Sequence, residues 1–178
     1  MTGTTVLASS LLGLALLAAA LGWRLHGNRF VAALVIGSTL AAVLPVEAVA
    51  RSTPGEATTA ALVVALAVLA VAGGGPVTAA TFRLVDGPGA PRTGSVRRAA
   101  EVLRGGAWIG ALERVAVFAS LASGWPEGLA LTLAIKGLGR YPELRHEERP
   151  GIAERFLIGT FVSVLWACAC AGLALRLL

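Results

Sequence analysis

Long apolar stretches alternate with short polar segments along the whole of this 178-residue chain. A hydrocarbon core about 30 Å thick is crossed by about 20 apolar residues in a helix. The stretch from Gly105 to Leu138 is too long for one crossing, and Ser123-Gly124-Trp125-Pro126 divides it, because Gly and Pro together end one helix and begin another. We therefore predict an all-α, polytopic bundle of six transmembrane helices, over residues 5–22, 30–50, 57–85, 106–122, 126–139 and 152–177.

The composition supports a membrane protein. Hydrophobic residues make up 56% of the chain and charged residues only 14%, whereas a soluble domain has about 25% charged residues. The mean hydropathy is +0.78. The net charge of +5 is carried by arginines in short loops, which we interpret as topology signals and phospholipid contacts. Membrane lipids are therefore expected partners, and nucleic acid is not.

The distribution of Lys and Arg predicts the orientation of the bundle. With six spans, the loops alternate between two sides; one side receives twelve basic residues and the other two, while Arg114 lies within a span. Because basic residues are in excess on the cytoplasmic side, we expect both termini outside, in the inner membrane of a bacterium. The predicted cytoplasmic residues are Arg24, Arg29, Arg83, Arg92, Arg97, Arg98, Arg104, Lys136, Arg140, Arg145, Arg149 and Arg155, and the two external ones are Arg51 and Arg176.

We predict one integral membrane domain over residues 1–178. Residues 1–85 hold three spans, residues 86–104 form a turn-rich cytoplasmic connector, and residues 105–178 hold three more. Two halves of three spans have opposite topology, as in inverted-repeat transporters, but the halves show no convincing residue-by-residue similarity. A cleaved signal peptide is the alternative for the first span, with Ala18-Ala19-Ala20 as its cleavage site; no Lys or Arg precedes the apolar region, which argues against it.

Ionisable residues in the last three spans are the strongest candidates for function. Glu113 and Arg114 lie roughly 12–14 Å from the cytoplasmic end of their helix, at about 1.5 Å per residue. Charge at such depth costs roughly 2.5–3.5 kcal/mol on insertion scales, and adjacent residues diverge by about 100° around a helix. We expect Glu113 to pair with Lys136 or Arg155, and Arg114 to pair with Glu154 or with a backbone carbonyl.

Two interpretations of these charges stay open. In one, they form a structural lattice of polar contacts between membrane helices, each contributing about 0.6 kcal/mol on average. In the other, they enclose a hydrated pocket for an ion or an anionic group, because deep acidic groups in membranes mark functional sites. Glu113 would then be the proton-sensitive or ion-pairing group. For Lys136 and Arg155 we favour a structural or lipid-contacting role.

A glycine-rich segment interrupts the third span. Pro suits the first turn of a new helix, so Gly73-Gly74-Gly75-Pro76 predicts a broken helix whose second half begins at Pro76, with Thr78 in its first turn. The N–H groups and positive dipole of such an end favour an anion. Close packing of another helix against the small residues is the alternative. In the last span, Thr160 and Ser163 share a face and are expected either to donate into the pocket or to bond to their own helix.

Other polar residues give weaker signals. Glu47 is expected near the external end of its helix. His26 and His146 have no third ligand at metal spacing, so we predict no metal and no cofactor. Cys168 and Cys170 are two residues apart and do not face each other on a helix, which favours small thiols packed between helices.

Three motifs in the C-terminal part of the chain resemble a known pattern. They are GGAWIGALER at 105–114, KGLGRYPEL at 136–144 and ERFLIGT at 154–160. With the stretch 73–86, they resemble a family of uncharacterised, chiefly actinobacterial, polytopic membrane proteins. The heavy use of Ala, Gly, Val, Leu and Arg fits such a source. That family has no established activity, so the resemblance supports the location of the site without supplying its chemistry.

Our leading hypothesis is an inner-membrane protein whose polar pocket binds an anionic solute or a lipid phosphate and takes part in its translocation. The candidate binding residues are Glu113, Arg114, Lys136, Arg140, Glu154, Arg155, Thr160, Gly74, Gly75 and Thr78.

Two alternatives remain. One is a non-transporting accessory or assembly subunit, in which the charges hold the helices together and the loop 83–104 docks a partner membrane protein; a homo-oligomer is also compatible with the sequence. The other is an enzyme acting on a lipid-linked substrate, for which Glu143, Glu154 and His146 are the only sensible acid–base groups. It is disfavoured because no histidine–aspartate cluster, zinc signature or phosphate-binding loop is present.

Overall fold

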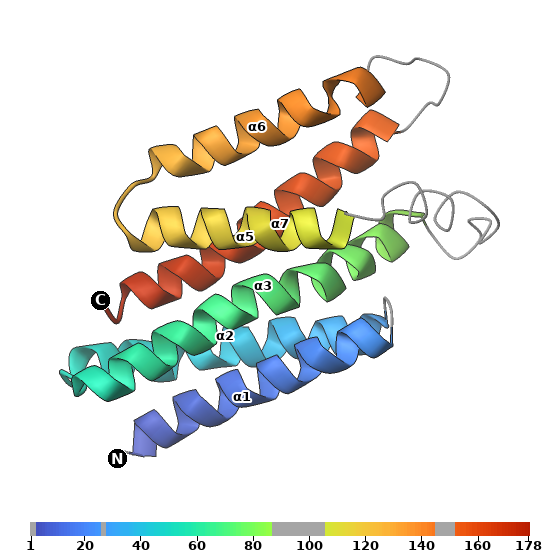
Figure 1. Cartoon of the computed structure of the whole chain (residues 1–178). Coiled ribbons are helices and arrows are strands. Elements are labelled where there is room, and N and C mark those ends of the chain that lie inside the picture. The colour runs from blue at the N-terminus through green and yellow to red at the C-terminus, as the bar shows by residue number, and fades with distance from the viewer. Residues whose placement is uncertain (1–2, 26–27, 87–105, 145–151) are drawn as a thin grey trace.

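A computed structural model describes residues 3–25, 28–86, 106–144 and 152–178 of the chain (Figure 1). These residues form six helices and no strand. The prediction of an all-α fold is thereby confirmed. The helices are α1 (Gly3–Arg24), α2 (Arg29–Arg51), α3 (Glu56–Asp86), α5 (Gly106–Ala122), α6 (Glu127–Leu144) and α7 (Ile152–Leu175).

Four of these helices have the length and apolarity needed to cross a membrane. They are α1, α2, α3 and α7, and the most apolar windows of all four have a mean hydropathy of 2.0 or more. The helices α5, with 17 residues, and α6, with 18 residues, carry charged side chains inside them. These four helices indicate a membrane protein. That α5 and α6 also cross the membrane stays a prediction.

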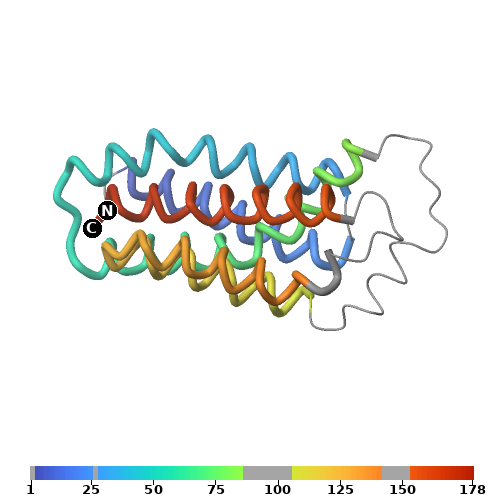
Figure 2. Tube along the Cα trace, turned by 90° about the horizontal axis from the view of Figure 1, so that it is seen from above, coloured from blue at the N-terminus to red at the C-terminus, as the bar shows by residue number. Residues whose placement is uncertain are grey.

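Helix α3 occupies the centre of the bundle. It contacts α1, α2, α5 and α7, whereas α6 packs on α5 at the edge. The helices lie side by side, and both termini lie at the same end (Figures 1 and 2). Successive helices run in alternate directions, so the end of α3, the start of α5 and the start of α7 all lie at the end opposite the termini.

Many of the residues at the contacts between helices are small, and many of the large apolar residues are exposed on the outside of the bundle. On α1, for example, Ala8, Leu12, Ala15 and Ala19 are almost fully buried at helical spacing, whereas Leu17 is 71% exposed. Membrane helices pack in this way because lipid solvates large apolar side chains and small residues let backbones approach closely. The core cluster joins α1, α2, α3 and α7, with Phe118 of α5 packed against them.

Two boundary predictions are wrong. Helix α6 does not end at Gly139 but continues to Leu144, although Gly137 and Gly139 each lower the stability of the helix by about 1 kcal/mol. Lys136 therefore lies inside the helix rather than at its end.

Helix α3 is not broken at Gly73–Pro76. It runs without interruption from Glu56 to Asp86, with Pro76 inside it. Pro76 consequently starts no new helix, and the predicted row of unpaired N–H groups at Gly74, Gly75 and Thr78 does not exist. The alternative, close packing against small residues, is the arrangement found.

Candidate functional site

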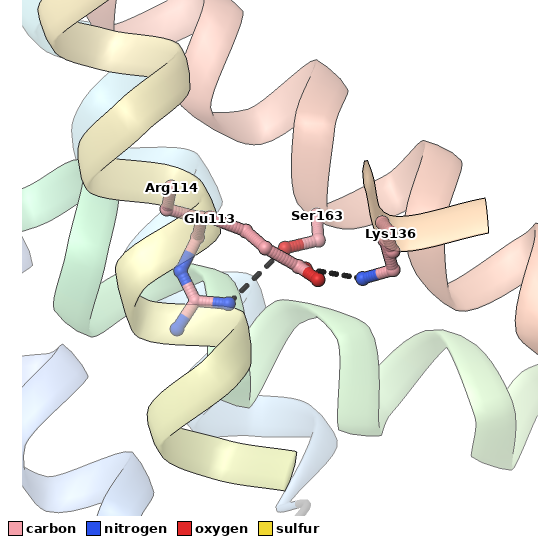
Figure 3. A network of polar contacts seen from close by, with 4 residues as sticks. All are labelled: Glu113, Arg114, Lys136 and Ser163. Carbon is pink, nitrogen blue, oxygen red and sulfur yellow. Dashed lines mark hydrogen bonds and ion pairs between the residues drawn. The ribbon is translucent and has the colours of Figure 1, made fainter. Parts of the chain in front are cut away.

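Glu113 and Lys136 form an ion pair between α5 and α6 (Figure 3). The Lys136 ammonium group donates to Glu113 Oε2, and the two side chains are only 18% and 13% exposed, respectively. Lys136 Nζ also lies 5.8 Å from the centre of the Phe156 ring on α7, within the range of a cation–π contact. Of the two partners predicted for Glu113, the structure thus selects Lys136, and the pair carries no net charge.

Arg114 is directed away from this pair, into the junction of α3, α5 and α7. Its side chain is buried, with 5% of the residue exposed. Its Nε donates to the Val71 carbonyl of α3 at 3.0 Å, and its Nη1 donates to Ser163 Oγ of α7 at 3.1 Å. Figure 3 shows the Arg114 guanidinium and the Glu113 carboxylate pointing to different partners. The backbone-carbonyl alternative for Arg114 is therefore the one realised.

No carboxylate of the described residues pairs with Arg114. Among the described residues, Glu113 accepts from Lys136 and Glu47 from Arg176, and the contacts of Arg114 are the two hydrogen bonds above. Of its three nitrogens, Nε and Nη1 each make one hydrogen bond, and Nη2 makes none with the described residues. A guanidinium has five N–H donors, so Arg114 retains donors that could bind a further acceptor.

The glycine at position 74 makes room for this arginine. A Cβ atom added there would lie 2.5 Å from Arg114 Cδ and 2.7 Å from Nε. On α5 itself, a Cβ at Gly110 would lie 3.3 Å from Nη1. Arg114 therefore occupies space that two glycines leave open.

Two tryptophans use the neighbouring glycines in the same way. The Trp166 ring of α7 covers Gly73, where an added Cβ would be 2.7 Å from Cζ2, and the Trp23 ring of α1 lies beside Gly75. The indole N–H of Trp166 donates to the Leu69 carbonyl at 3.1 Å, and that of Trp23 to the Ala72 carbonyl at 2.9 Å. Three helices are thus anchored by side-chain donors to one turn of α3.

Pro76 explains the contact of Trp23. A proline in a helix has no N–H for the carbonyl four residues earlier, which here is Ala72. The Trp23 indole supplies a donor to that carbonyl. The close approach of α1 depends on Gly22, where an added Cβ would be 2.6 Å from Pro76 Cγ.

Two buried hydroxyls on the helices that Arg114 contacts have no hydrogen-bond partner within the described part of the chain. They belong to Thr78 of α3 and Thr160 of α7. Each lies one helical turn from a residue that Arg114 contacts: Thr78 follows Gly74 by four residues, and Thr160 precedes Ser163 by three. The sequence predicted that Thr160 and Ser163 either donate into a pocket or bond to their own helix. Ser163 accepts from Arg114 instead, and the Thr160 hydroxyl has no hydrogen-bond partner among the described residues.

Comparisons with protein-family models, with curated proteins and with solved structures found no match to this chain. The resemblance to the actinobacterial membrane family therefore stays a prediction.

The remaining predicted site residues lie outside this junction. Glu154 and Arg155 are exposed at the start of α7, and the Arg155 guanidinium carbon lies 5.6 Å from the centre of the Phe82 ring. Arg140 is half-buried on α6, one turn after Lys136. His26 and His146 lie outside the described residues, as does the side chain of Glu143.

Other predicted residues occupy structural positions. Glu47 accepts from Arg176 at 2.7 and 3.2 Å at the end of the bundle that holds the termini. Cys170 is buried and Cys168 half-buried in α7. The described part of the chain holds no group of three or more His, Cys, Asp or Glu that would suit a metal.

Sequence reasoning missed Trp23 and Trp166 as partners of the glycine segment. Each is an ordinary aromatic residue in an apolar span, and its indole N–H gives no pattern that points to a carbonyl on another helix.

Proposed function

We propose that this chain is a six-span inner-membrane protein, with both termini outside, that binds an anionic solute or a lipid phosphate at Arg114 and takes part in its translocation. The observation that carries the proposal is the Arg114 guanidinium, which is buried and has no carboxylate partner among the described residues. A buried positive charge in a medium of low dielectric constant attracts an anion strongly.

The charge balance around Arg114 supports a negatively charged ligand. The cluster of Glu113, Lys136 and Arg114 carries a single net positive charge. An arginine also offers planar, paired donors that suit carboxylate and phosphate oxygens.

The surrounding basic residues fit an approach from the predicted cytoplasmic side. Arg140 lies in the last turns of α6 and Arg155 in the first turn of α7, at the same end of the bundle (Figure 1). Positive side chains at the mouth of a site raise the local concentration of anions. Arg140 and Arg155 would thus attract the ligand, and Arg114 would bind it.

Translocation further requires that Arg114 become accessible from each side in turn. Helix α3 carries the anchor of Arg114, the Val71 carbonyl, and Pro76 removes one hydrogen bond from the same helix. Helices bend at such positions. A bend of α3 at Gly73–Pro76 would move the Val71 carbonyl relative to α5 and change the exposure of Arg114.

Anion flux into proteoliposomes tests this proposal. The purified chain should transport or bind an anion in the wild-type form, and Arg114→Gln should abolish this while Arg114→Lys keeps part of it. Arg176→Gln, which removes an exposed arginine at the bundle end, is the matched control and should leave flux unchanged. If Arg114→Gln is folded and as active as the wild type, Arg114 has no role in an anion site.

An accessory or assembly subunit is the second candidate. It is favoured by the closed Glu113–Lys136 pair, which gives α6 a fixed polar contact with the rest of the bundle. This function predicts a stoichiometric partner membrane protein after mild solubilisation. Anion flux through the isolated chain would rule it out.

A further inference from the structure

We infer that the anion at Arg114 is a singly charged oxyanion, and that the hydroxyls of Thr160 and Thr78 are its additional donors. This inference rests on the proposed function and narrows the ligand class. It comes from the charge count at the junction and from the two hydroxyls without partners.

The charge count favours a single negative charge. Among the described residues at the junction, Glu113 and Lys136 cancel, and Arg114 contributes one positive charge. A monoanion brings the junction to neutrality. A dianion would leave one net negative charge buried between the helices, and an uncompensated buried charge costs several kcal/mol.

The two hydroxyls favour a ligand with several acceptor atoms. A threonine inside a helix normally donates to the carbonyl of its own helix four residues earlier. Thr39, which is 5% exposed, does so to the Val35 carbonyl at 2.7 Å, and Thr81 does so to Val77 at 3.0 Å. Thr160, which is 8% exposed, and Thr78 do not. A buried donor left unpaired costs about 1–3 kcal/mol, so an acceptor beside it is strongly favoured.

The positions of these donors bring them to one region between α3 and α7. Thr78 and Gly74 lie on the same face of α3, and Thr160 and Ser163 on the same face of α7. The two helices are close here, because a Cβ at Gly159 would lie 3.8 Å from Thr78 Cγ2. The guanidinium and the hydroxyls are thus separated by about one helical turn, roughly 5.4 Å along each axis.

A ligand with several oxygens suits such a span better than a halide, which presents one atom. The matching chemistry is a singly charged oxyanion, of which a phosphodiester is the clearest example. Such a group occurs in a phospholipid head group and in a small solute alike. The two sources present the same oxygens to Arg114, so the experiment has an arm for each.

The solute arm measures binding to the purified full chain in detergent by calorimetry, at constant ionic strength. The probes are dimethyl phosphate, a monoanionic diester; sulfate, a dianion; and chloride. We expect dimethyl phosphate to bind at least about tenfold more tightly than sulfate or chloride. Thr160→Val should weaken this binding about tenfold, the loss of one hydrogen bond to a charged group. Thr160→Ser, which keeps the hydroxyl, should bind as the wild type does.

The matched control is Thr39→Val, because Thr39 is equally buried but already bonded to its own helix. It should leave the affinity for dimethyl phosphate unchanged.

The lipid arm repeats the binding measurement in nanodiscs with and without phosphatidylglycerol and detects retained lipid by native mass spectrometry. Retention of one phosphatidylglycerol that is lost in Thr160→Val identifies a lipid head group as the ligand, and dimethyl phosphate binding without lipid retention identifies a solute.

Two results would overturn the inference while leaving the proposed function intact. One is Arg114-dependent binding of sulfate as tight as that of dimethyl phosphate. The other is Arg114-dependent binding that survives both Thr160→Val and Thr78→Val. If no probe and no lipid binds in an Arg114-dependent manner, the proposed function itself fails and the inference fails with it.

Discussion

Three consecutive glycines of α3 each receive one large side chain from a different helix. Gly73 receives Trp166, Gly74 receives Arg114 and Gly75 lies beside Trp23. Each of these side chains also donates a hydrogen bond to a carbonyl of the preceding turn. The glycines therefore serve two purposes, because a missing Cβ both admits the side chain and exposes the carbonyl to it. The three glycines lower the helix propensity of this segment, and the contacts with other helices compensate for the lost stability.

Gly74→Ala should therefore destabilise the protein. The added methyl group would lie 2.5 Å from Arg114 Cδ, so either the arginine or α5 must move, at a cost of about 1–3 kcal/mol for overpacking. The measurement is the unfolding midpoint of the purified protein in detergent. Gly37→Ala on α2 is the control, since a Cβ there meets nothing within 4 Å; it should be neutral or stabilise by up to about 1 kcal/mol. Equal midpoints for the two variants would contradict the packing described for Gly74.

The Glu113–Lys136 pair allows a second test at the level of single residues. Glu113→Gln leaves the Lys136 ammonium without its acid between α5 and α6. Breaking a fully buried pair costs about 3–5 kcal/mol, and the partial exposure of these side chains lowers the expected loss to about 1–2 kcal/mol.

The exchanged double variant Glu113→Lys with Lys136→Glu should restore most of the lost stability. Glu127→Gln, which removes an exposed acid at the start of α6, should change the midpoint little. If Glu113→Gln unfolds at the wild-type midpoint, the pair contributes nothing to the docking of α6.

At the scale of the element, α3 lacks one backbone hydrogen bond at Pro76, and a side chain of another helix replaces it. Pro76 stays inside the helix because the surrounding helices hold it there, although proline costs an isolated helix about 3 kcal/mol. The carbonyl deprived of its N–H is that of Ala72, and the Trp23 indole of α1 donates to it. The defect in one helix thereby determines where the next helix docks.

A double-mutant cycle tests this relation. Trp23→Phe keeps the ring and removes the indole N–H, so the Ala72 carbonyl loses its donor, at a cost of about 1–3 kcal/mol. In a Pro76→Ala background, the helix itself supplies an N–H to that carbonyl, and Trp23→Phe should then cost less than half as much. Unfolding midpoints of the four proteins give the coupling. Additive effects would show that the indole and the proline act independently.

Most of the helices could be predicted from sequence because the lengths of the apolar stretches determine where they begin and end. The predicted span 106–122 has the same bounds as α5, and the ends of α1, α2 and α3 differ by only one or two residues. The path of α3 could not be predicted, because the partners that hold Pro76 inside it come from α1, α5 and α7.

The ion pair of the site could be predicted from sequence, whereas the partners of Arg114 could be predicted only as alternatives. Glu113 was predicted to pair with Lys136 or Arg155 because a deep acid needs a base and few bases were available in neighbouring spans; the structure shows Lys136 as its partner. The choice of Val71 and Ser163 by Arg114 depends on the rotation of three helices about their axes. Apolar sequence determines that rotation only through the detailed fit of small side chains.

At the scale of the whole molecule, the six helices of the described residues alternate in direction, although only four of them have the length and apolarity of membrane spans. The four are α1, α2, α3 and α7, and an even number of crossings keeps the termini on one side whether or not α5 and α6 cross. The position of the termini therefore does not decide between four and six spans. The side of the membrane that holds the turn between α5 and α6 would decide it, and in the bundle this turn lies at the same end as the termini (Figure 1).

Labelling of single cysteines in intact cells decides the number of spans. In a background with Cys168→Ser and Cys170→Ser, cysteines are introduced one at a time at Gly55, Ser123 and Leu25, which lie in exposed turns between helices. With six spans and external termini, an impermeant maleimide should label Gly55→Cys and Ser123→Cys, and should label Leu25→Cys only after lysis. With four spans, Gly55→Cys is still labelled, but Ser123→Cys requires lysis. The second outcome would place Glu113 and Lys136 outside the hydrocarbon core and remove the argument that the depth of these charges requires a function.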